Sequence, residues 1–429
     1  MTSEAEVPGG VRRNRYVDLV RLISIIVVVV GHWLDTIIRI EDGRPVGESA
    51  LAVVGYVRWL TLLLQVMPLF FVAGGFAAAA SWPSWRARGG HWAGWTRGRL
   101  VRLLQPTAWF VGIMAVLAGV ALLAGLDPSV VAQAGWGVAL QLWFLPVFML
   151  LIVLAVPLLV AWDRAGWLTL AVAAGLTAVV DMLVRVGHIE AAGWLSFLLA
   201  PGAGFILGVA WHAGAFTRRA VPVAMLVGGV LGLLVLVLLF DYPPWMIGIP
   251  GGPRSNTAPP NLALMAYSAA QIGLVLLLEP TARRWLQRER VWLGVIRGNA
   301  VIMTLYLWHM VPVLVIGGLM VAGLPPGPVP GTAMWWVWRV PWIAALAIVL
   351  FGIVALVGRF EQTRPPRLGL RGWPASALLV VCAVLTGYAL IRLALGGFAP
   401  AGQLAVGALA IYAAGMLALW PAGRGGGGG

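Results

Sequence analysis

Residues 17–38, VDLVRLISIIVVVVGHWLDTII, form a long apolar run that contains an arginine, Arg21, and a histidine, His32. A run of about 20 apolar residues is long enough to cross a bilayer as a helix. Charged and ionisable side chains are costly inside a membrane, so those that occur there mark candidate functional sites. This stretch therefore predicts a membrane-spanning helix with a functional role.

The polar residues of this run share one face of the expected helix. Arg21 and His32 are eleven positions apart, and at about 100° per residue they return to nearly the same azimuth. A rise of ~1.5 Å per residue places them roughly 16 Å apart along the axis. Asp18 and Asp35 fall within about 60° of the same stripe. We therefore expect one polar seam of acid, cation, imidazole and acid.

The composition is that of an integral membrane protein. The chain has 429 residues, of which 61% are hydrophobic and 10% charged, with a mean hydropathy of +0.93. Soluble domains carry about 25% charge, so we expect a single membrane domain. The lone cysteine, Cys382, excludes an intrachain disulfide. The five scattered histidines predict no metal site, and no glycine-rich phosphate loop occurs.

Apolar runs of spanning length recur along the chain, and they predict an all-α polytopic bundle of about twelve helices. We expect spans near 17–38, 56–80, 105–125, 139–161, 166–185, 193–211, 221–240, 261–279, 298–321, 336–358, 374–394 and 402–420. The first span lacks the exit site of a cleaved signal peptide, so we expect it to be retained. The segment 81–104 mixes tryptophan with arginine, as an interfacial amphipathic segment does.

All 29 basic residues are arginines, and their distribution predicts the topology. Twenty-one fall in alternate loops and tails that would face the cytoplasm, whereas the opposite loops hold only Arg39, Arg44, Arg185 and Arg254. By the positive-inside rule, both termini should be cytoplasmic. Topology therefore explains the net charge of +14, and we expect no nucleic-acid partner.

Two residues of the seam suit proton transfer and phosphate binding. Imidazole exchanges protons near neutral pH, so His32 could deprotonate a hydroxyl, with Asp35 orienting the ring or stabilising its cation. The guanidinium of Arg21 matches a phosphate group. The alternatives are that His32 only bonds a neighbouring helix, and that Arg21 extends to the interface and pairs with Asp18.

The segment RYVDLVRLISIIVVVVGHWLD, residues 15–35, resembles the first helix of the bacterial acyltransferase-3 family of membrane O-acyltransferases. That helix carries an acid, then an arginine, ten further residues and a histidine. Later segments resemble the family in the expected order: MPLFFVAGGFAAA (67–79), LLQPTAW (103–109), LQLWFLPVFMLL (140–151) and GNAVIMTLYLWHMVP (298–312). The likeness covers about 15–362.

This resemblance implies a ten-helix core that passes an acyl group, expected to be acetyl or another short chain, from cytoplasmic acyl-CoA to a hydroxyl. The acceptor would be a glycan, a glycolipid or a similar cell-envelope or secondary-metabolite molecule. Acyl-CoA is then a donor substrate, and no permanently bound cofactor is expected. By the same resemblance, His32 would act as base or acyl carrier, and Asp35 and Asp18 are the other catalytic candidates.

The remaining candidate residues follow from their positions. The donor-binding candidates are Arg21, Arg97, Arg99 and Arg102, and the weaker substrate-binding candidates are Trp143, Tyr306 and His309. Ser255 and Asn256 are candidate acceptor contacts in the longest outside loop. We expect a cytoplasmic tail at 1–14, the acyltransferase core at 15–362, additional membrane helices at 363–420 and a disordered tail at 421–429. These features place the protein in the cytoplasmic membrane as a multi-pass protein.

Two other functions remain open from the sequence. Twelve spans with a polar seam would also suit a transporter or a flippase of a glycan or lipid, although no internal repeat is evident. A transferase that uses a polyprenyl-phosphate donor would favour acidic residues in the first outside loop, where Glu41, Asp42 and Glu48 occur. The ordered resemblance favours the acyltransferase.

Overall fold

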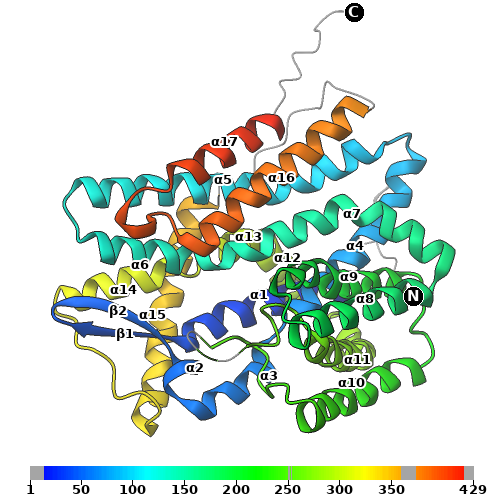
Figure 1. The fold of residues 1–429 in the computed structure, drawn as a ribbon, viewed down its shortest axis with the longest axis horizontal. Coiled ribbons are helices and arrows are strands. Elements are labelled where there is room, and N and C mark those ends of the chain that lie inside the picture. The colour runs from blue at the N-terminus through cyan, green and yellow to red at the C-terminus, as the bar shows by residue number, and fades with distance from the viewer. Residues whose placement is uncertain (1–13, 250–251, 253, 359–372, 420–429) are drawn as a thin grey trace, which may run out of the picture.

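The computed structural model describes residues 14–249, 252, 254–358 and 373–419. In this part of the chain, eleven helices are long and apolar enough to cross a membrane, which confirms the predicted all-α polytopic bundle. Figure 1 shows the long helices running side by side, with a small β-hairpin at one end of the bundle. Residues 1–13 of the predicted cytoplasmic tail and the predicted disordered tail at 421–429 lie outside the described residues.

Seven single helices and four composite spans make up the spanning set. The single helices are α1 (Arg15–Asp35), α5 (Trp92–Leu123), α8 (Trp167–Arg185), α10 (Ala220–Leu239), α11 (Leu262–Trp285), α15 (Ala333–Val357) and α16 (Trp373–Gly396). The composite spans are Gly55–Ala87, which ends in α4 (Met67–Ala87), Pro128–Ala165, which ends in α7 (Phe144–Ala165), Glu190–His212, which ends in α9 (Gly193–His212), and Ile302–Val321, which joins α13 (Ile302–Trp308) and α14 (Val311–Val321). The shorter helices are α2 (Ala50–Val53), η1 (Gly55–Leu60), α3 (Thr61–Leu64), α6 (Pro128–Ala139), η2 (Leu140–Trp143), η3 (Glu190–Ala192), α12 (Glu289–Ala300), η5 (Pro400–Gly402) and α17 (Val406–Leu419). The twelfth predicted span corresponds to α17, whose 14 residues are fewer than the about 20 that a crossing requires.

Helix α1 begins and ends at defined local signals. The Asn14 side chain caps it by accepting hydrogen bonds from the amides of Tyr16 and Val17. The predicted span to residue 38 is too long, because the chain becomes extended at Thr36 and forms β1 (Thr36–Glu41), which pairs with β2 (Arg44–Ser49). The turn is Asp42-Gly43, both with positive φ, which is the usual chemistry of a tight hairpin.

Two other predicted spans are interrupted near α1. The span at 56–80 is instead η1 and α3, a break at Gln65, and then α4, whose start is fixed by Pro68. The span at 298–321 is broken between α13 and α14, where Pro312 begins the second helix. The predicted interfacial segment 81–104 is the end of α4 and the beginning of α5, which starts 13 residues before the predicted span.

Helices α4 and α9 approach each other closely at glycines. A β-carbon on Gly75 would lie 1.9 Å from the carbonyl oxygen of Phe205, and one on Gly208 would lie 1.9 Å from that of Val72. Any larger residue would force the helices apart, so the close crossing depends on glycine. This contact explains the role of the AGG sequence in α4 and fixes α4 within the core.

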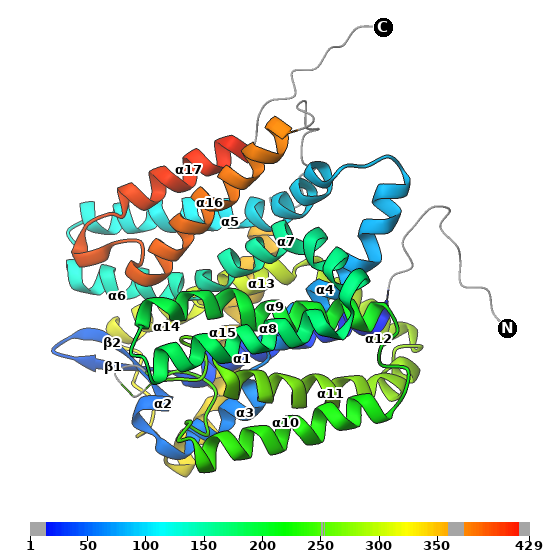
Figure 2. The same ribbon diagram turned by 45° about the vertical axis from the view of Figure 1, so that its right-hand side comes forward.

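The C-terminal helices pack against the rest of the bundle. Figures 1 and 2 show α16 and α17 lying along α5 and α7 at one edge. The ring of Phe398, after α16, meets Phe110 of α5 edge-on with centroids 6.2 Å apart. The Tyr412 hydroxyl donates to the Leu104 carbonyl, and Leu390 and Leu393 are fully buried. These helices are therefore an integral layer of the fold.

Candidate active site

His32, three residues before the end of α1, contacts a second histidine from the opposite end of the sequence. His32 Nδ1 lies 2.7 Å from Nε2 of His309, which occupies the break between α13 and α14, and the two rings stack with centroids 5.0 Å apart. The other ring nitrogen of His309, Nδ1, lies 2.6 Å from the main-chain oxygen of Tyr306. A continuous hydrogen-bonded chain thus connects His32 to a backbone carbonyl.

This chain determines which ring nitrogens carry hydrogen. The carbonyl oxygen of Tyr306 can only accept a hydrogen bond, so His309 Nδ1 is the donor. A neutral imidazole has hydrogen on one nitrogen, so His309 Nε2 accepts and His32 Nδ1 donates. Nε2 of a neutral His32 is then unprotonated, and it makes no hydrogen bond to any described residue. The arrangement therefore prepares His32 to act as a base.

Aromatic side chains and a buried arginine hold this end of α1 in place. Trp33 Nε1 donates to the His309 carbonyl at 2.6 Å, and Trp342 Nε1 donates to the Trp33 carbonyl at 3.0 Å. Arg339, which is buried in α15, donates to the Thr36 carbonyl at 2.9 Å. These contacts fix the position of both histidines relative to α15, as a preorganised site requires.

Asp35 lies next to His32 but is held by other groups. Its Oδ1 accepts hydrogen bonds from the Ser49 hydroxyl at 2.7 Å and the Leu51 amide at 3.0 Å. The group that hydrogen bonds to the His32 ring is His309, so Asp35 acts on the ring through electrostatics alone. The same charge also interacts with Arg339. The β-hairpin and α2 thus position the carboxylate beside the imidazole.

His32 and Asp35 line a cavity of about 570 Å³, a volume typical of small-molecule sites. Most of its wall is apolar. The α1 residues in the wall run from Val27 to Asp35, and none comes from the Arg21 end. The other walls come from α2 to α4, η2 and α7, the beginning of α9, α13, the end of α16, and the residues Ile247, Thr257 and Ala258.

The three weaker substrate-contact candidates are placed differently. Trp143 and Tyr306 line the cavity, whereas His309 is fully buried behind His32 and is not among the lining residues. Gln141 also lines the cavity, and its main-chain oxygen accepts the hydrogen bond of the Tyr306 hydroxyl. The Gln141 side chain donates to the Leu307 carbonyl at 3.1 Å.

At the other end of α1, three of the four predicted donor-binding arginines converge. Arg99 of α5 is close enough to both Arg21 and Arg102 to repel them electrostatically. Arg99 also lies over the Trp95 ring at 4.1 Å and donates to the Ala77 carbonyl. The fourth, Arg97, is directed toward α17, where its Nε lies 3.4 Å from the Leu419 carbonyl. The structure therefore assembles a cationic cluster at this end.

Asp18, a catalytic candidate from the sequence, belongs to this cationic end. Because α1 is continuous, the 14 positions between Asp18 and His32 separate them by roughly 21 Å along the axis at ~1.5 Å per residue. Asp18 is buried, and its main-chain oxygen accepts from the Asn299 amide at 2.9 Å. The structure thus places Asp18 and the histidine pair at different ends of the helix.

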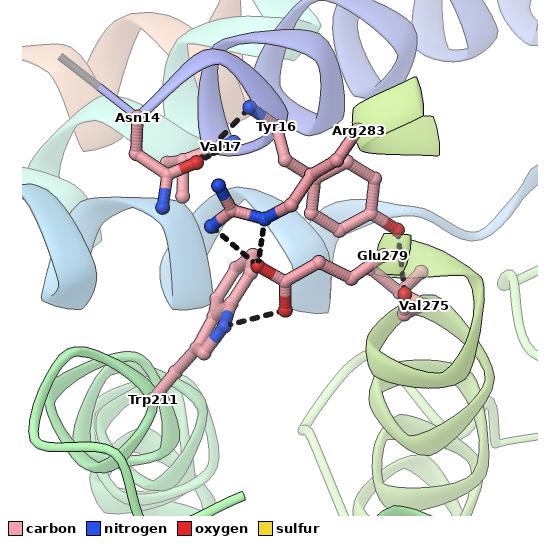
Figure 3. A network of polar contacts seen from close by, with 7 residues as sticks. All are labelled: Asn14, Tyr16, Val17, Trp211, Val275, Glu279 and Arg283. Carbon is pink, nitrogen blue, oxygen red and sulfur yellow. Dashed lines mark hydrogen bonds and ion pairs between the residues drawn. The ribbon is translucent and has the colours of Figure 1, made fainter. Parts of the chain in front are cut away.

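A polar network that the sequence analysis did not identify anchors the beginning of α1 (Figure 3). The Tyr16 hydroxyl donates to the Val275 carbonyl of α11. Nearby, Glu279 accepts from the Trp211 indole at 3.1 Å and forms an ion pair with Arg283 at 2.7 Å. The spacing of Glu279 and Arg283 signals their pairing, but the contact with α9 depends on the tertiary fold.

The two candidates in the predicted outside loop, Ser255 and Asn256, make hydrogen bonds to other residues of that loop. The Asn256 side-chain amide donates to the carbonyls of Pro243 and Trp245, and Ser255 Oγ accepts from the Ala258 amide. Glu48 forms a cross-strand ion pair with Arg39 at 2.9 Å. Within the described ranges, no three histidine, cysteine or carboxylate side chains lie close enough together to hold a metal ion.

Comparison with known proteins gave one match. A family model described as an acyltransferase domain matches residues 14–358. No curated protein and no solved structure matches the chain. The matched region contains both ends of α1 and the histidine pair, and it ends before α16.

Proposed function

Because the chain belongs to the acyltransferase-3 family, a family of membrane acyltransferases, we propose that it moves an acyl group from acyl-CoA to an acceptor hydroxyl, with His32 as the general base. The expected acyl group is acetyl or another short chain. The expected acceptor is a glycan, a glycolipid or a similar cell-envelope or secondary-metabolite molecule. Family membership supports acyl transfer, and the site geometry supports the role of His32.

The observation that carries this proposal is the hydrogen bond between His32 and His309 at the wall of the cavity that His32 lines. As the acceptor oxygen attacks the thioester carbonyl, Nε2 takes the hydroxyl proton. The new carbon–oxygen bond replaces the carbon–sulfur bond, and the proton passes to the departing CoA sulfur. The transient imidazolium is stabilised by its hydrogen bond to His309 and by the negative charge of Asp35.

The cationic cluster suits the donor. Guanidinium groups offer paired hydrogen-bond donors that match phosphate oxygens, so Arg21, Arg99 and Arg102 would hold the phosphates of CoA. From the positive-inside rule we expect this end of α1 to face the cytoplasm, where acyl-CoA is available. The pantetheine arm would then extend along α1 toward His32. The acceptor would reach His32 through the cavity, away from the cationic cluster.

The first test is acetyl-CoA binding to the purified protein in detergent. We expect saturable binding to the wild type and about tenfold weaker binding to Arg21→Ala, since a hydrogen bond to a charged group contributes about 1.5–3 kcal/mol. Arg21→Lys should fall between the two, because it keeps the charge but loses the paired donors. Arg185→Ala, which alters a residue at the end of α8, is the control and should bind normally.

The opposite result would remove the donor assignment. If folded wild-type protein binds neither acetyl-CoA nor a longer acyl-CoA, acyl-CoA is not the donor. If binding is normal in Arg21→Ala, the donor site lies away from α1.

A further inference from the structure

Helix α16 follows the matched domain, which ends at residue 358, yet it contributes to the cavity that holds His32. Ile391, Ala394 and Leu395 line this cavity together with Pro146, Val147 and Leu150 of α7. The helix is firmly seated there, since its Leu390 and Leu393 side chains are fully buried. A part of the chain outside the family domain therefore forms one wall of the candidate site.

The rim of the cavity is apolar and exposed on membrane-spanning helices. Leu395 of α16 is 65% exposed, Trp194 at the beginning of α9 is 60% exposed and Leu150 of α7 is 42% exposed, and all three line the cavity. Exposed aliphatic and aromatic side chains on spanning helices face lipid. The cavity therefore reaches the exposed apolar surface of α7, α9 and α16.

Gln141, which lines the same cavity, carries a buried polar atom without a partner in the described structure. The Gln141 side chain is 99% buried, as only 1% of its surface is exposed, and its Oε1 has no hydrogen-bond partner among the described residues. Buried polar groups are normally paired, and an unpaired acceptor is costly. A ligand that donates a hydrogen bond would satisfy this atom.

We propose that α16 is the specificity wall of the site, where Ile391, Ala394 and Leu395 seat the apolar part of an amphiphilic acceptor and Gln141 bonds its hydroxyl-bearing part. The acceptor enters from the bilayer, with its apolar chain between α7 and α16. The identification of the occupant as the acceptor rests on the proposed function. The phosphate end of the donor is assigned elsewhere, because α1 lines the cavity only from Val27 to Asp35, away from Arg21.

The test uses full-length protein in lipid nanodiscs and dodecyl maltoside with a diazirine at the end of its alkyl chain. Irradiation followed by peptide mass spectrometry locates the label. We expect labelling of cavity-lining residues of α7 and α16, with competition by unlabelled dodecyl maltoside and none by maltose. Ile391→Trp and Leu395→Trp, which narrow the cavity, should each reduce this labelling at least fivefold.

The matched control is Val384→Trp, which places the same side chain at a 62% exposed position of α16 that does not line the cavity. It should label as the wild type does. Gln141→Leu keeps the apolar wall but removes the acceptor atom. It should therefore raise the concentration of unlabelled dodecyl maltoside that halves the labelling, while the labelled residues remain those that line the cavity. Leu395 is an exposed position, so its variant should fold even if Ile391→Trp does not.

Labelling spread over the lipid-facing surface, or an equal reduction in Val384→Trp, would overturn the inference. Acetyl-CoA binding is measured on the same samples and reports separately on the donor. If the cavity is labelled but acetyl-CoA does not bind, the amphiphile site is supported and acyl-CoA is not the donor. If acetyl-CoA binds but the cavity is not labelled, the donor is supported and the role of α16 as the specificity wall is overturned.

Discussion

The two ends of α1 differ in how their polar groups are used. At the beginning of the helix, Asn14 caps the backbone and Tyr16 bonds to α11, beside the Glu279–Arg283 ion pair. At the far end, His32 bonds through one ring nitrogen to His309 and leaves the other beside a cavity. The first arrangement is closed by contacts within the protein, whereas the second keeps a reactive atom available.

This contrast separates residues that position α1 from the residue proposed to react. Closed networks raise stability and fix geometry, whereas an unpaired acceptor in a cavity adds nothing to folding and needs a ligand to satisfy it. Substitutions at the two ends should therefore affect different measurements. The following predictions test that division, from the largest expected effect to the smallest.

His32→Ala should cause the largest loss of activity. Removal of a general base typically lowers the rate by about 10²–10⁴-fold, and we expect a loss of that size in the rate of acyl transfer. The free energy of unfolding should fall by only about 1–3 kcal/mol, because the variant leaves Nε2 of the buried His309 without its hydrogen-bond partner. Radiolabelled acetyl transfer and thermal unfolding of the same preparation check both parts. An equal loss of folded protein would assign His32 to packing.

His309→Leu should lower the transfer rate by about 10- to 100-fold. This estimate follows from a hydrogen bond to a charged group of about 1.5–3 kcal/mol, at about 1.4 kcal/mol per tenfold change in rate. The variant cannot accept from His32 Nδ1, so neither the tautomer nor the imidazolium is stabilised.

His309→Gln is the matched variant, since its amide oxygen can still accept from His32 and its amide nitrogen can donate. It should recover part of the activity. Equal losses in both variants would show that His309 acts through its shape and not through its hydrogen bonds. Rates are compared at saturating donor, with acetyl-CoA affinity measured separately.

Tyr16→Phe should have the smallest effect on catalysis. It removes only the hydrogen bond to the Val275 carbonyl, so the free energy of unfolding should fall by about 0.5–1.5 kcal/mol. The transfer rate should stay within about twofold of the wild type, because the cationic cluster and the histidine pair are untouched. A loss as large as that of His309→Leu would contradict the division between the two ends.

The features that depend on nearby residues could be predicted from the sequence. The spanning helices follow from apolar runs, and the shared face of Arg21 and His32 follows from helical periodicity. The hairpin after Asp35 was missed because a β-branched run, TII, continued the apolar pattern, although its Asp42-Gly43 turn was a usable signal.

The partners of the polar residues could not be predicted, because they depend on the tertiary fold. His32 and His309 are 277 positions apart, and their contact requires the break before Pro312. The contribution of α16 to the cavity has the same origin, since Ile391 and Leu395 read as ordinary lipid-facing residues. Their position becomes clear only when α16 is seen beside α7.

The hydrogen-bonded chain that begins at His32 ends on the main-chain carbonyl of Tyr306, and this affects which mutations the site can tolerate. A side-chain acceptor can be lost by a single codon change, but a backbone carbonyl is present whatever residue occupies the position. The tautomer of the histidine pair therefore depends on the path of the backbone and not on the side chain at position 306. Sequence drift at position 306 can reshape the cavity without altering which nitrogen of His32 is basic.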